Sequence, residues 1–224
     1  PAGYFESNRR AALAAGESMG IDLSEVDFTK FPGMKRRQSV LHESESRSVV
    51  EDYAHHPTEI RAFLSKRRLQ LPDHLLQVVF QPHRFSRTQA LAEHLAEELS
   101  QADDLHLMPT YGAFEKFDQA GSAETLMGYL PPRLRDRTRI FSEFSELRNA
   151  IGPTPSGNDQ DQVLFVGAGD LERWAHAFAS WEQANGDKHN AFAHYLSTRL
   201  SGLTPLLSDE PLASKTTIGV GGAS

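Results

Sequence analysis

The stretch that decides the fold is LLQVVFQPHRFSRT, residues 75–88. Its first six residues form a compact, largely apolar run, which is long enough for a buried strand. Directly after the turn, residues 86–100 carry Leu91, Leu95 and Leu99 at steps of four, and this spacing predicts an amphipathic helix. A buried strand that leads through a short turn into a helix is the repeating unit of an α/β sheet.

Strand and helix patterns alternate on both sides of this stretch. Upstream, residues 38–42 and 48–52 predict a β-hairpin, and Pro57 stands where the next helix would begin. Downstream, the predicted order is strand 105–108, helix 123–129, strand 139–141, helix 142–151, strand 163–166 and a helix through Trp181. This alternation predicts an α/β fold with a Rossmann-like open, mostly parallel sheet and helices on both faces.

Ligands of such sheets bind beyond the carboxyl ends of the strands. That rule selects three segments, residues 52–58, 80–88 and 167–170. Each of them follows a predicted strand and opens a predicted helix. These segments therefore hold the candidate site residues.

The composition excludes several classes of function. The 224 residues carry a formal net charge of −7, which argues against a general nucleic-acid or anionic-membrane binder. The absence of cysteine excludes disulfides and thiolate metal sites, and no apolar amino-terminal run indicates a signal peptide or anchor. We expect a cytoplasmic protein without a nucleic-acid partner or a membrane insertion.

The two ends of the chain differ from its middle. Residues 8–19 predict a helix that stops at Gly20, and the basic run 35–37 marks a domain boundary near residue 37. Residues 186–199 predict a further helix, and residues 203–224 show no helical periodicity. Because the chain does not begin with methionine, we expect a piece of a longer protein.

The first candidate segment combines an acid, a phenol and two imidazoles at a strand end: Asp52, Tyr53, His55 and His56. One interpretation is a ligand-binding or catalytic cluster. The other is local, with Asp52 capping the following helix and the histidines satisfying backbone groups. The residues alone do not decide between the two.

The second segment resembles an anion site. Arg84 and Arg87 are three residues apart, so on a helical turn they would project from one face, beside unpaired backbone N–H groups. A guanidinium suits two-point contact with a carboxylate or phosphate. The alternative is a pair of surface arginines bonded to nearby carboxylates.

The third segment, Gly167-Ala168-Gly169-Asp170, resembles part of a phosphate-binding turn, but Glu172 stands where the third glycine of that motif belongs. The pattern favours a tight turn with Asp170 as the cap of the next helix. No G-x-x-x-x-G-K-[ST] phosphate loop occurs in the chain, so these residues alone cannot activate ATP in that way.

Three strings together resemble one family, the Mur ligases. DYAHHPTEI at 52–60, FQPHRFSRT at 80–88 and VGAGD at 166–170 are similar to the carboxy-terminal domain of these enzymes, in the right order. The sequence FQPHR at residues 80–84 favours the members of the family that join L-alanine to UDP-N-acetylmuramate. The resemblance covers roughly residues 8–180, and the loop at 109–115 departs from it at Pro109 and Phe114.

A second, shorter resemblance lies in the tail. Residues 209–222 are similar to the opening of a flavin-dependent UDP-N-acetylenolpyruvoylglucosamine reductase. This implies a ligase-reductase fusion, with FAD and NADPH used only by the downstream reductase. The implied organisation is residues 1–37 as the end of a central ATP-binding domain and its joint, 38–185 as the carboxy-terminal domain, and 186–224 as linker and start of the reductase.

The family resemblance implies an ATP-dependent, ADP-forming ligase of peptidoglycan synthesis, with UDP-N-acetylmuramate, L-alanine, ATP and Mg²⁺ as partners. By the same resemblance, Arg84 and Arg87 would hold the alanine carboxylate, and His55 and Tyr53 would line that pocket. Asp52 would approach the nucleotide ribose with His56 nearby. The resemblance assigns no residue of this chain to catalysis or to metal binding.

Two rival functions remain. A metal-dependent hydrolase would use Asp52, His55, His56 and His83, although adjacent histidines on a short turn rarely point at one ion. A noncatalytic nucleotide-binding module would keep the fold and lose the site.

Overall fold

The computed structural model describes residues 4–23, 34–155 and 159–184. The chain divides into two compact units, residues 1–37 and 38–224. In the first unit, α1 (Tyr4–Ser18) begins four residues earlier than the sequence pattern predicts. The predicted helix at 186–199 and the reductase-like tail at 209–222 lie outside the described residues.

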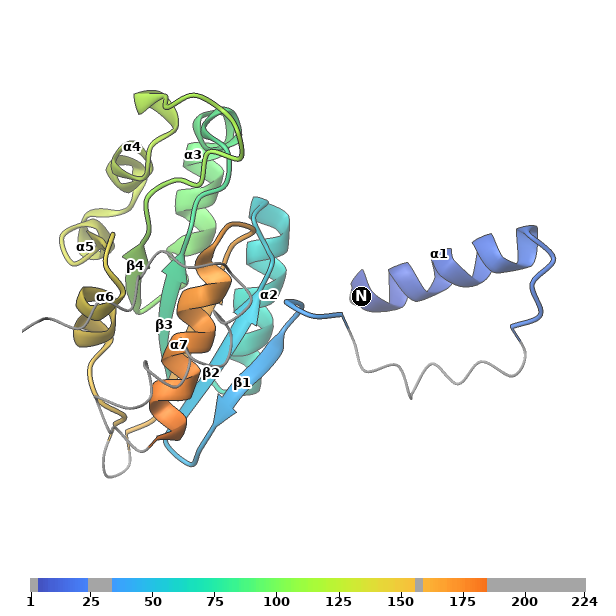
Figure 1. The fold of residues 1–224 in the computed structure, drawn as a ribbon, viewed down its shortest axis with the longest axis horizontal. Helices are drawn as coiled ribbons and strands as arrows, with labels where there is room; N and C mark the ends of the chain where they lie inside the picture. The colour runs from blue at the N-terminus through green and yellow to red at the C-terminus, as the bar shows by residue number, and fades with distance from the viewer. Residues whose placement is uncertain (1–3, 24–33, 156–158, 185–224) are drawn as a thin grey trace, which may run out of the picture. The chain divides into compact units, whose positions relative to one another are not determined.

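The second unit is built on a six-stranded sheet with the order β1-β2-β6-β3-β4-β5 (Figure 1). The strands are β1 (Ser39–Glu43), β2 (Arg47–Asp52), β3 (Leu75–Phe80), β4 (Asp104–Leu107), β5 (Arg139–Ile140) and β6 (Asp161–Val166). Only the β1–β2 hairpin pairs antiparallel, and every other pair is parallel. The predicted open, mostly parallel sheet is therefore confirmed.

Helices connect the strands as the sequence periodicity predicts. They are α2 (Pro57–Gln70), α3 (Phe85–Leu99), α4 (Ala123–Tyr129), α5 (Pro132–Arg135), α6 (Phe144–Ile151) and α7 (Leu171–Gln183). The sequence periodicity does not predict α5 or the 3₁₀ turn η2 (Gln119–Gly121), because one turn of helix is too short to show a period. No helix in the described part of the chain is long and apolar enough to cross a membrane.

Alternating strand residues supply two separate cores, one on each face of the sheet. Val50, Val78 and Leu164 pack with residues of α2, α3 and α4. The residue adjacent to each of these in the strand, which is Val49, Val79 or Phe165, packs instead with α6 and α7. Figure 1 shows α7 crossing in front of the sheet, while α2 and α3 lie behind it. Helices on both faces leave only the sheet's ends for a ligand.

The amino-terminal end of the sheet contains a buried charge cluster. Arg47, at the start of β2, donates to Asp161, at the start of β6, through Nη2 at 2.6 Å and Nε at 2.8 Å. Its Nη1 donates to Glu182 of α7 at 2.6 Å. The side chains of all three are at most 3% exposed. The cluster joins two central strands to the last turn of α7.

Candidate functional site

The three candidate segments converge at the carboxyl end of the sheet, because β6 lies between β2 and β3. The backbone joins them directly: Gly167 N–H donates to the Asp52 carbonyl at 3.0 Å, and Gln81 N–H donates to the Val166 carbonyl at 3.1 Å. The segments that the strand-end rule selects are thus neighbours in space. The rings of Tyr53, His55, His83 and Tyr111 and the side chains of two arginines lie on or beside them.

Asp52 and His56 have local backbone roles. The Asp52 side chain is 3% exposed, and its two oxygens accept from Gln38 N–H at 3.0 Å and Ala54 N–H at 2.7 Å. The cap of α2 is His56, whose Nδ1 accepts from Thr58 N–H at 3.4 Å. The interpretation of Asp52 as helix cap is therefore wrong. Its carboxylate instead stabilises the turn that leads from β2 to the helix.

Four rings form a continuous row beside the turn. Tyr53 and His55 have ring centroids 5.5 Å apart, His55 and His83 are 5.7 Å apart, and His83 stacks on Tyr111 at 5.5 Å. The Nδ1–H of His55 donates to the Tyr53 carbonyl at 3.0 Å, which fixes the tautomer of that imidazole. The row brings together residues from three separate segments of the chain.

Arg84 lies just before α3 and is not part of a helical turn. It is the N-cap residue of α3, with φ of 71° and ψ of 125°. A non-glycine residue in this region of backbone space costs about 1–3 kcal/mol, and surrounding contacts must hold it there. Its Nε donates to the Glu115 carboxylate at 2.9 Å. The three-residue spacing would align Arg84 with Arg87 only on a helical turn, and Arg84 does not meet that condition, because tertiary contacts place its side chain.

Arg87, within the first turn of α3, points toward an imidazole rather than a carboxylate. Its Nη1 lies 3.5 Å from Nδ1 of His83. Burial lowers the pKa of His83, and the nearby charges of His55, Arg87 and Arg84 lower it further. A neutral His83 can accept a hydrogen bond from Arg87. Both arginines act electrostatically on this one ring, so they belong to one site. Only Arg84 follows the alternative interpretation of an arginine bonded to a nearby carboxylate.

The two glycines of the third segment allow another chain segment to approach closely. A Cβ on Gly167, where φ is +155°, would lie 2.9 Å from the Gln81 carbonyl oxygen. A Cβ on Gly169 would lie 2.3 Å from Oε1 of Gln81. Real Cβ contacts are essentially never shorter than 3.0 Å, so both positions require glycine. The tight turn predicted from the sequence brings β6 and β3 together at the site.

Gln81 caps α7 in place of Asp170. Its Oε1 accepts from Leu171 N–H at 3.1 Å, and its Nε2 donates to Oδ1 of Asp170 at 2.6 Å. Asp170 occupies the N-cap position but makes no side-chain cap hydrogen bond. The predicted capping role of Asp170 is therefore wrong, because its carboxylate accepts from the neighbouring turn instead.

We expect Gln81→Leu to lower the free energy of unfolding by about 1–2 kcal/mol, the usual effect of losing a helix cap with its buried partners. Leucine keeps most of the volume and removes both hydrogen bonds. Urea denaturation would measure the change. Gln89→Leu, at an exposed position of α3, is the matched control and should shift stability by less than about 0.5 kcal/mol. Equal stability of the two variants would contradict the capping role.

The four residues of the metal-hydrolase interpretation do not form an ion site. Asp52 and His56 are bonded to the backbone, whereas His55 and His83 face each other. Within the residues that the structure describes, no group of three or more His, Cys, Asp or Glu side chains could hold a metal ion.

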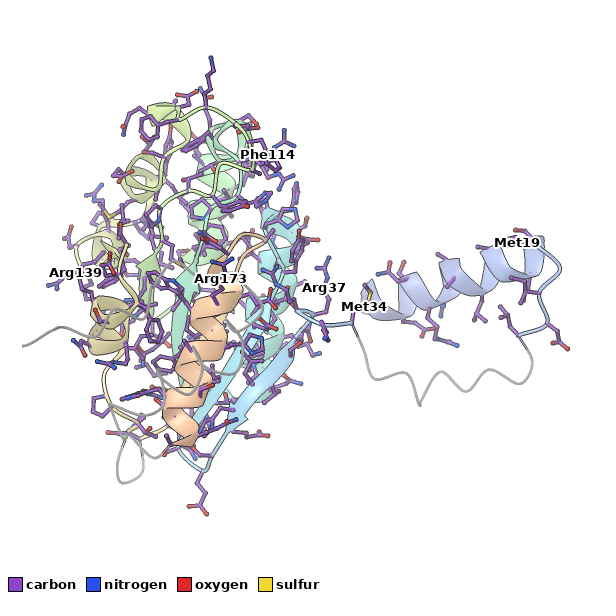
Figure 2. All side chains as sticks on the ribbon, viewed as in Figure 1. Met19, Met34, Arg37, Phe114, Arg139 and Arg173 are labelled. Carbon is purple, nitrogen blue, oxygen red and sulfur yellow. The ribbon has the colours of Figure 1, made fainter. Side chains whose placement is uncertain are left out.

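Three contributors to the site were not assigned from the sequence: Tyr111 and Glu115 of the loop after β4, and Gln81 at the end of β3. Tyr111 and Glu115 match the tyrosine and glutamate of the Mur ligase loop that residues 109–115 resemble, and this match is the sequence feature that could have identified them. Pro109 and Phe114 differ from that loop and made the resemblance weaker. Phe114, labelled in Figure 2, is fully exposed, so this departure does not disturb the loop's inward contacts.

Known proteins share this domain. A UDP-N-acetylmuramate–L-alanine ligase of Ligilactobacillus salivarius is 34% identical over 173 residues, which are 76% of this chain and 37% of that protein. The ligase of the same name from Desulfotalea psychrophila is 36% identical over 166 residues, or 73% and 36% of the two chains. The chain thus spans little more than a third of the length of these relatives.

A solved structure also resembles this domain. The crystal structure of a UDP-N-acetylmuramate-alanine ligase from Thermotoga maritima superposes with a TM-score of 0.56 at 27% identity, over 78% of this chain and 36% of that one. Residues 36–169 match the family described as "Mur ligase, glutamate ligase domain". This match covers more than half of the chain, including the first two segments of the site and residues 167–169 of the third. The chain therefore belongs to the Mur ligase family and contains its carboxy-terminal domain.

Proposed function

We propose that this domain binds the amino acid in an ATP-dependent ligase that joins L-alanine to UDP-N-acetylmuramate. One observation carries the proposal: Arg84 and Arg87 lie with His83 at the carboxyl end of the sheet, where this class of fold binds its ligands. The names of the similar ligases supply the identity of the amino acid.

The site's chemistry suits an amino acid. Two guanidinium groups on one side would hold a carboxylate by charge-assisted hydrogen bonds. The row of rings at Tyr53, His55, His83 and Tyr111 would border the same space and restrict the side chain. A carboxylate held in this way leaves the amine free to face an activated carbonyl. The domain would then contribute orientation, which is a large term in reactions between two bound substrates.

On the nucleotide side, we propose Asp52 and His56 as contacts of ATP. An ionised carboxylate only accepts hydrogen bonds, so Asp52, at the end of β2, would accept from a ribose hydroxyl. Nδ1 of His56 is engaged by Thr58, so Nε2 would make the contact. Mg²⁺, bound with ATP mainly by another domain, would screen phosphate charge. The part of the chain that the structure describes offers no metal group of its own.

We place residues 1–37 at the end of a central ATP-binding domain, residues 38–185 in the amino-acid-binding domain, and residues 186–224 in a linker and the start of a reductase. In this arrangement the isolated chain is inactive, because it has no phosphate loop. The protein would work in the cytoplasm, where the nucleotide precursors of peptidoglycan are made. The fusion would make FAD and NADPH relevant to the downstream reductase alone.

We expect Arg84→Ala and Arg87→Ala in the full-length ligase each to raise the KM for L-alanine by about 10- to 100-fold, because each removes a charge-assisted hydrogen bond to the carboxylate. The KM for ATP should change little. Steady-state kinetics with UDP-N-acetylmuramate held saturating would measure both constants.

The matched control is Arg139→Ala, an exposed arginine on the edge strand β5, labelled in Figure 2. Its alanine KM should equal that of the parent. A normal alanine KM in both the Arg84 and Arg87 variants would refute the pocket assignment. Calorimetry of the full-length protein with ATP, Mg²⁺ and both other substrates tests the alternative of a noncatalytic module, which would bind nucleotide without turnover.

A further inference from the structure

The loop after β4 is bound to the turn before α3. Arg84 N–H donates to the Tyr111 carbonyl at 2.7 Å, and Tyr111 N–H donates to the Pro82 carbonyl at 2.8 Å. The rings of His83 and Tyr111 stack across the same junction. Glu115 closes the loop through its N–H, which donates to the Gly112 carbonyl at 3.0 Å. The loop therefore holds Glu115 against the arginine turn.

The Glu115 carboxylate makes three contacts with the start of α3. Its Oε2 accepts from Ser86 N–H at 3.0 Å, and its Oε1 accepts from the Ser86 hydroxyl at 2.6 Å and from Arg84 Nε at 2.9 Å. Arg84, the N-cap residue, makes no side-chain cap bond, so Glu115 caps this helix from another part of the chain. The hydrogen bonds from Ser86, followed by those from Arg84, lower the pKa of Glu115 to about 2, so it is ionised at neutral pH.

The role of Glu115 depends on which edge of the Arg84 guanidinium it contacts. Glu115 contacts Nε only, and no hydrogen bond to Nη1 or Nη2 of Arg84 is formed within the described residues. The pair of Nη groups is an edge that can hold a carboxylate in two-point contact. The Arg84 side chain is 47% exposed, and among the described residues its one hydrogen bond is this Nε contact with Glu115. A ligand carboxylate and Glu115 can therefore bind Arg84 at the same time.

We propose that Glu115 is a positioning residue, which fixes the Arg84 side chain so that its Nη edge meets the amino-acid carboxylate. This inference rests on the proposed function of the arginine pair. It adds a third charged residue to the site. Glu115 would contact Arg84, and only the two arginines would contact the substrate carboxylate. The opposite role, in which Glu115 competes with the substrate for Arg84, predicts tighter binding when the carboxylate is removed.

The test uses Glu115→Gln and Glu115→Ala in the full-length ligase. Glutamine keeps one acceptor oxygen for Ser86 but loses the charge that holds Nε, so we expect the KM for L-alanine to rise about threefold in Glu115→Gln and about tenfold in Glu115→Ala. The kcat and the KM for ATP should stay within about twofold, because the bound amine is placed as before once the carboxylate is held. Glu93→Gln, an exposed glutamate on α3, is the matched control and should leave the alanine KM unchanged.

A double-mutant cycle separates positioning from a general effect on the loop. If Glu115 acts through Arg84, Glu115→Ala should have no further effect on the alanine KM in an Arg84→Ala background. Independent, additive effects, an unchanged KM or a lowered KM in the single variants would each overturn the proposal. Failure of the arginine pocket itself would look different, because Arg84→Ala alone would then leave the alanine KM normal. Thermal unfolding of each variant establishes that the protein remains folded at the assay temperature.

Discussion

Arg47→Met is expected to lower the free energy of unfolding by about 3–5 kcal/mol, the usual result of removing one partner from a buried ion pair. The substitution leaves Asp161 and Glu182 without the guanidinium that they share, in a site where each side chain is at most 3% exposed. Gln77 also donates to Asp161 at 2.7 Å and the Thr154 hydroxyl donates to Glu182, but neutral donors cannot compensate the charge of two buried carboxylates. Methionine replaces most of the arginine stem, so the loss reports charge rather than volume.

Equilibrium denaturation in urea at pH 7 would measure the loss. The control is Arg137→Met, which breaks an ion pair with Asp104 whose side chains are 57% and 34% exposed, and should cost less than about 1 kcal/mol. Removing all three buried charges, in Arg47→Met with Asp161→Asn and Glu182→Gln, should recover part of the stability. A loss below about 1 kcal/mol in Arg47→Met alone would show that the cluster is not a structural ion pair.

Protonation of His106 should lower the free energy of unfolding by about 3 kcal/mol as the pH falls from 6.5 to 4. The imidazole lies on β4, 9% exposed, edge-on to Phe141, and its Nε2 has no hydrogen-bond partner. Burial lowers the pKa of His106 to about 4 from its ordinary value of 6.5. The unfolded chain therefore binds the proton first, so this contribution is complete above pH 6.5 and decreases toward the folded pKa.

His106→Leu removes the titrating group and should flatten the stability curve between pH 6.5 and 4 relative to the parent. Other groups titrate in the same range, so the difference between the two curves carries the information. His94→Leu, at an exposed position of α3, is the control and should keep the parent's slope. Parallel curves for parent and His106→Leu would contradict the prediction.

The fold was predictable because its signals are local and repeated. Strands such as β3 are short apolar runs, and α3 shows leucines at four-residue steps, so each element could be recognised without its neighbours. The strand-end rule then selected the segments of the site, although not their order in the sheet. One-turn elements such as α5 are too short to show a periodic pattern and were not predicted.

The details of the site were harder to predict because they depend on partners far away in the sequence. The Arg84 side chain is placed by Glu115, 31 residues later, and the start of α7 is capped by Gln81, 90 residues earlier. Sequence spacing would align Arg84 with Arg87 only on a helical turn, which the structure does not form at Arg84, and the predicted self-capping by Asp170 was wrong. At each position a side chain distant in sequence, Glu115 or Gln81, makes the hydrogen bond that determines the local structure.

The strand order β2-β6-β3 has a consequence for how the chain assembles. β6 is the last strand in sequence but sits between two strands that are made more than 80 residues earlier. Until it enters, β2 and β3 have unpaired edges toward each other, and such edges can pair with other chains. Long-range pairing of this kind also slows folding. The ring row and the arginine turn therefore become neighbours only in a late step, when residues 161–166 complete the sheet.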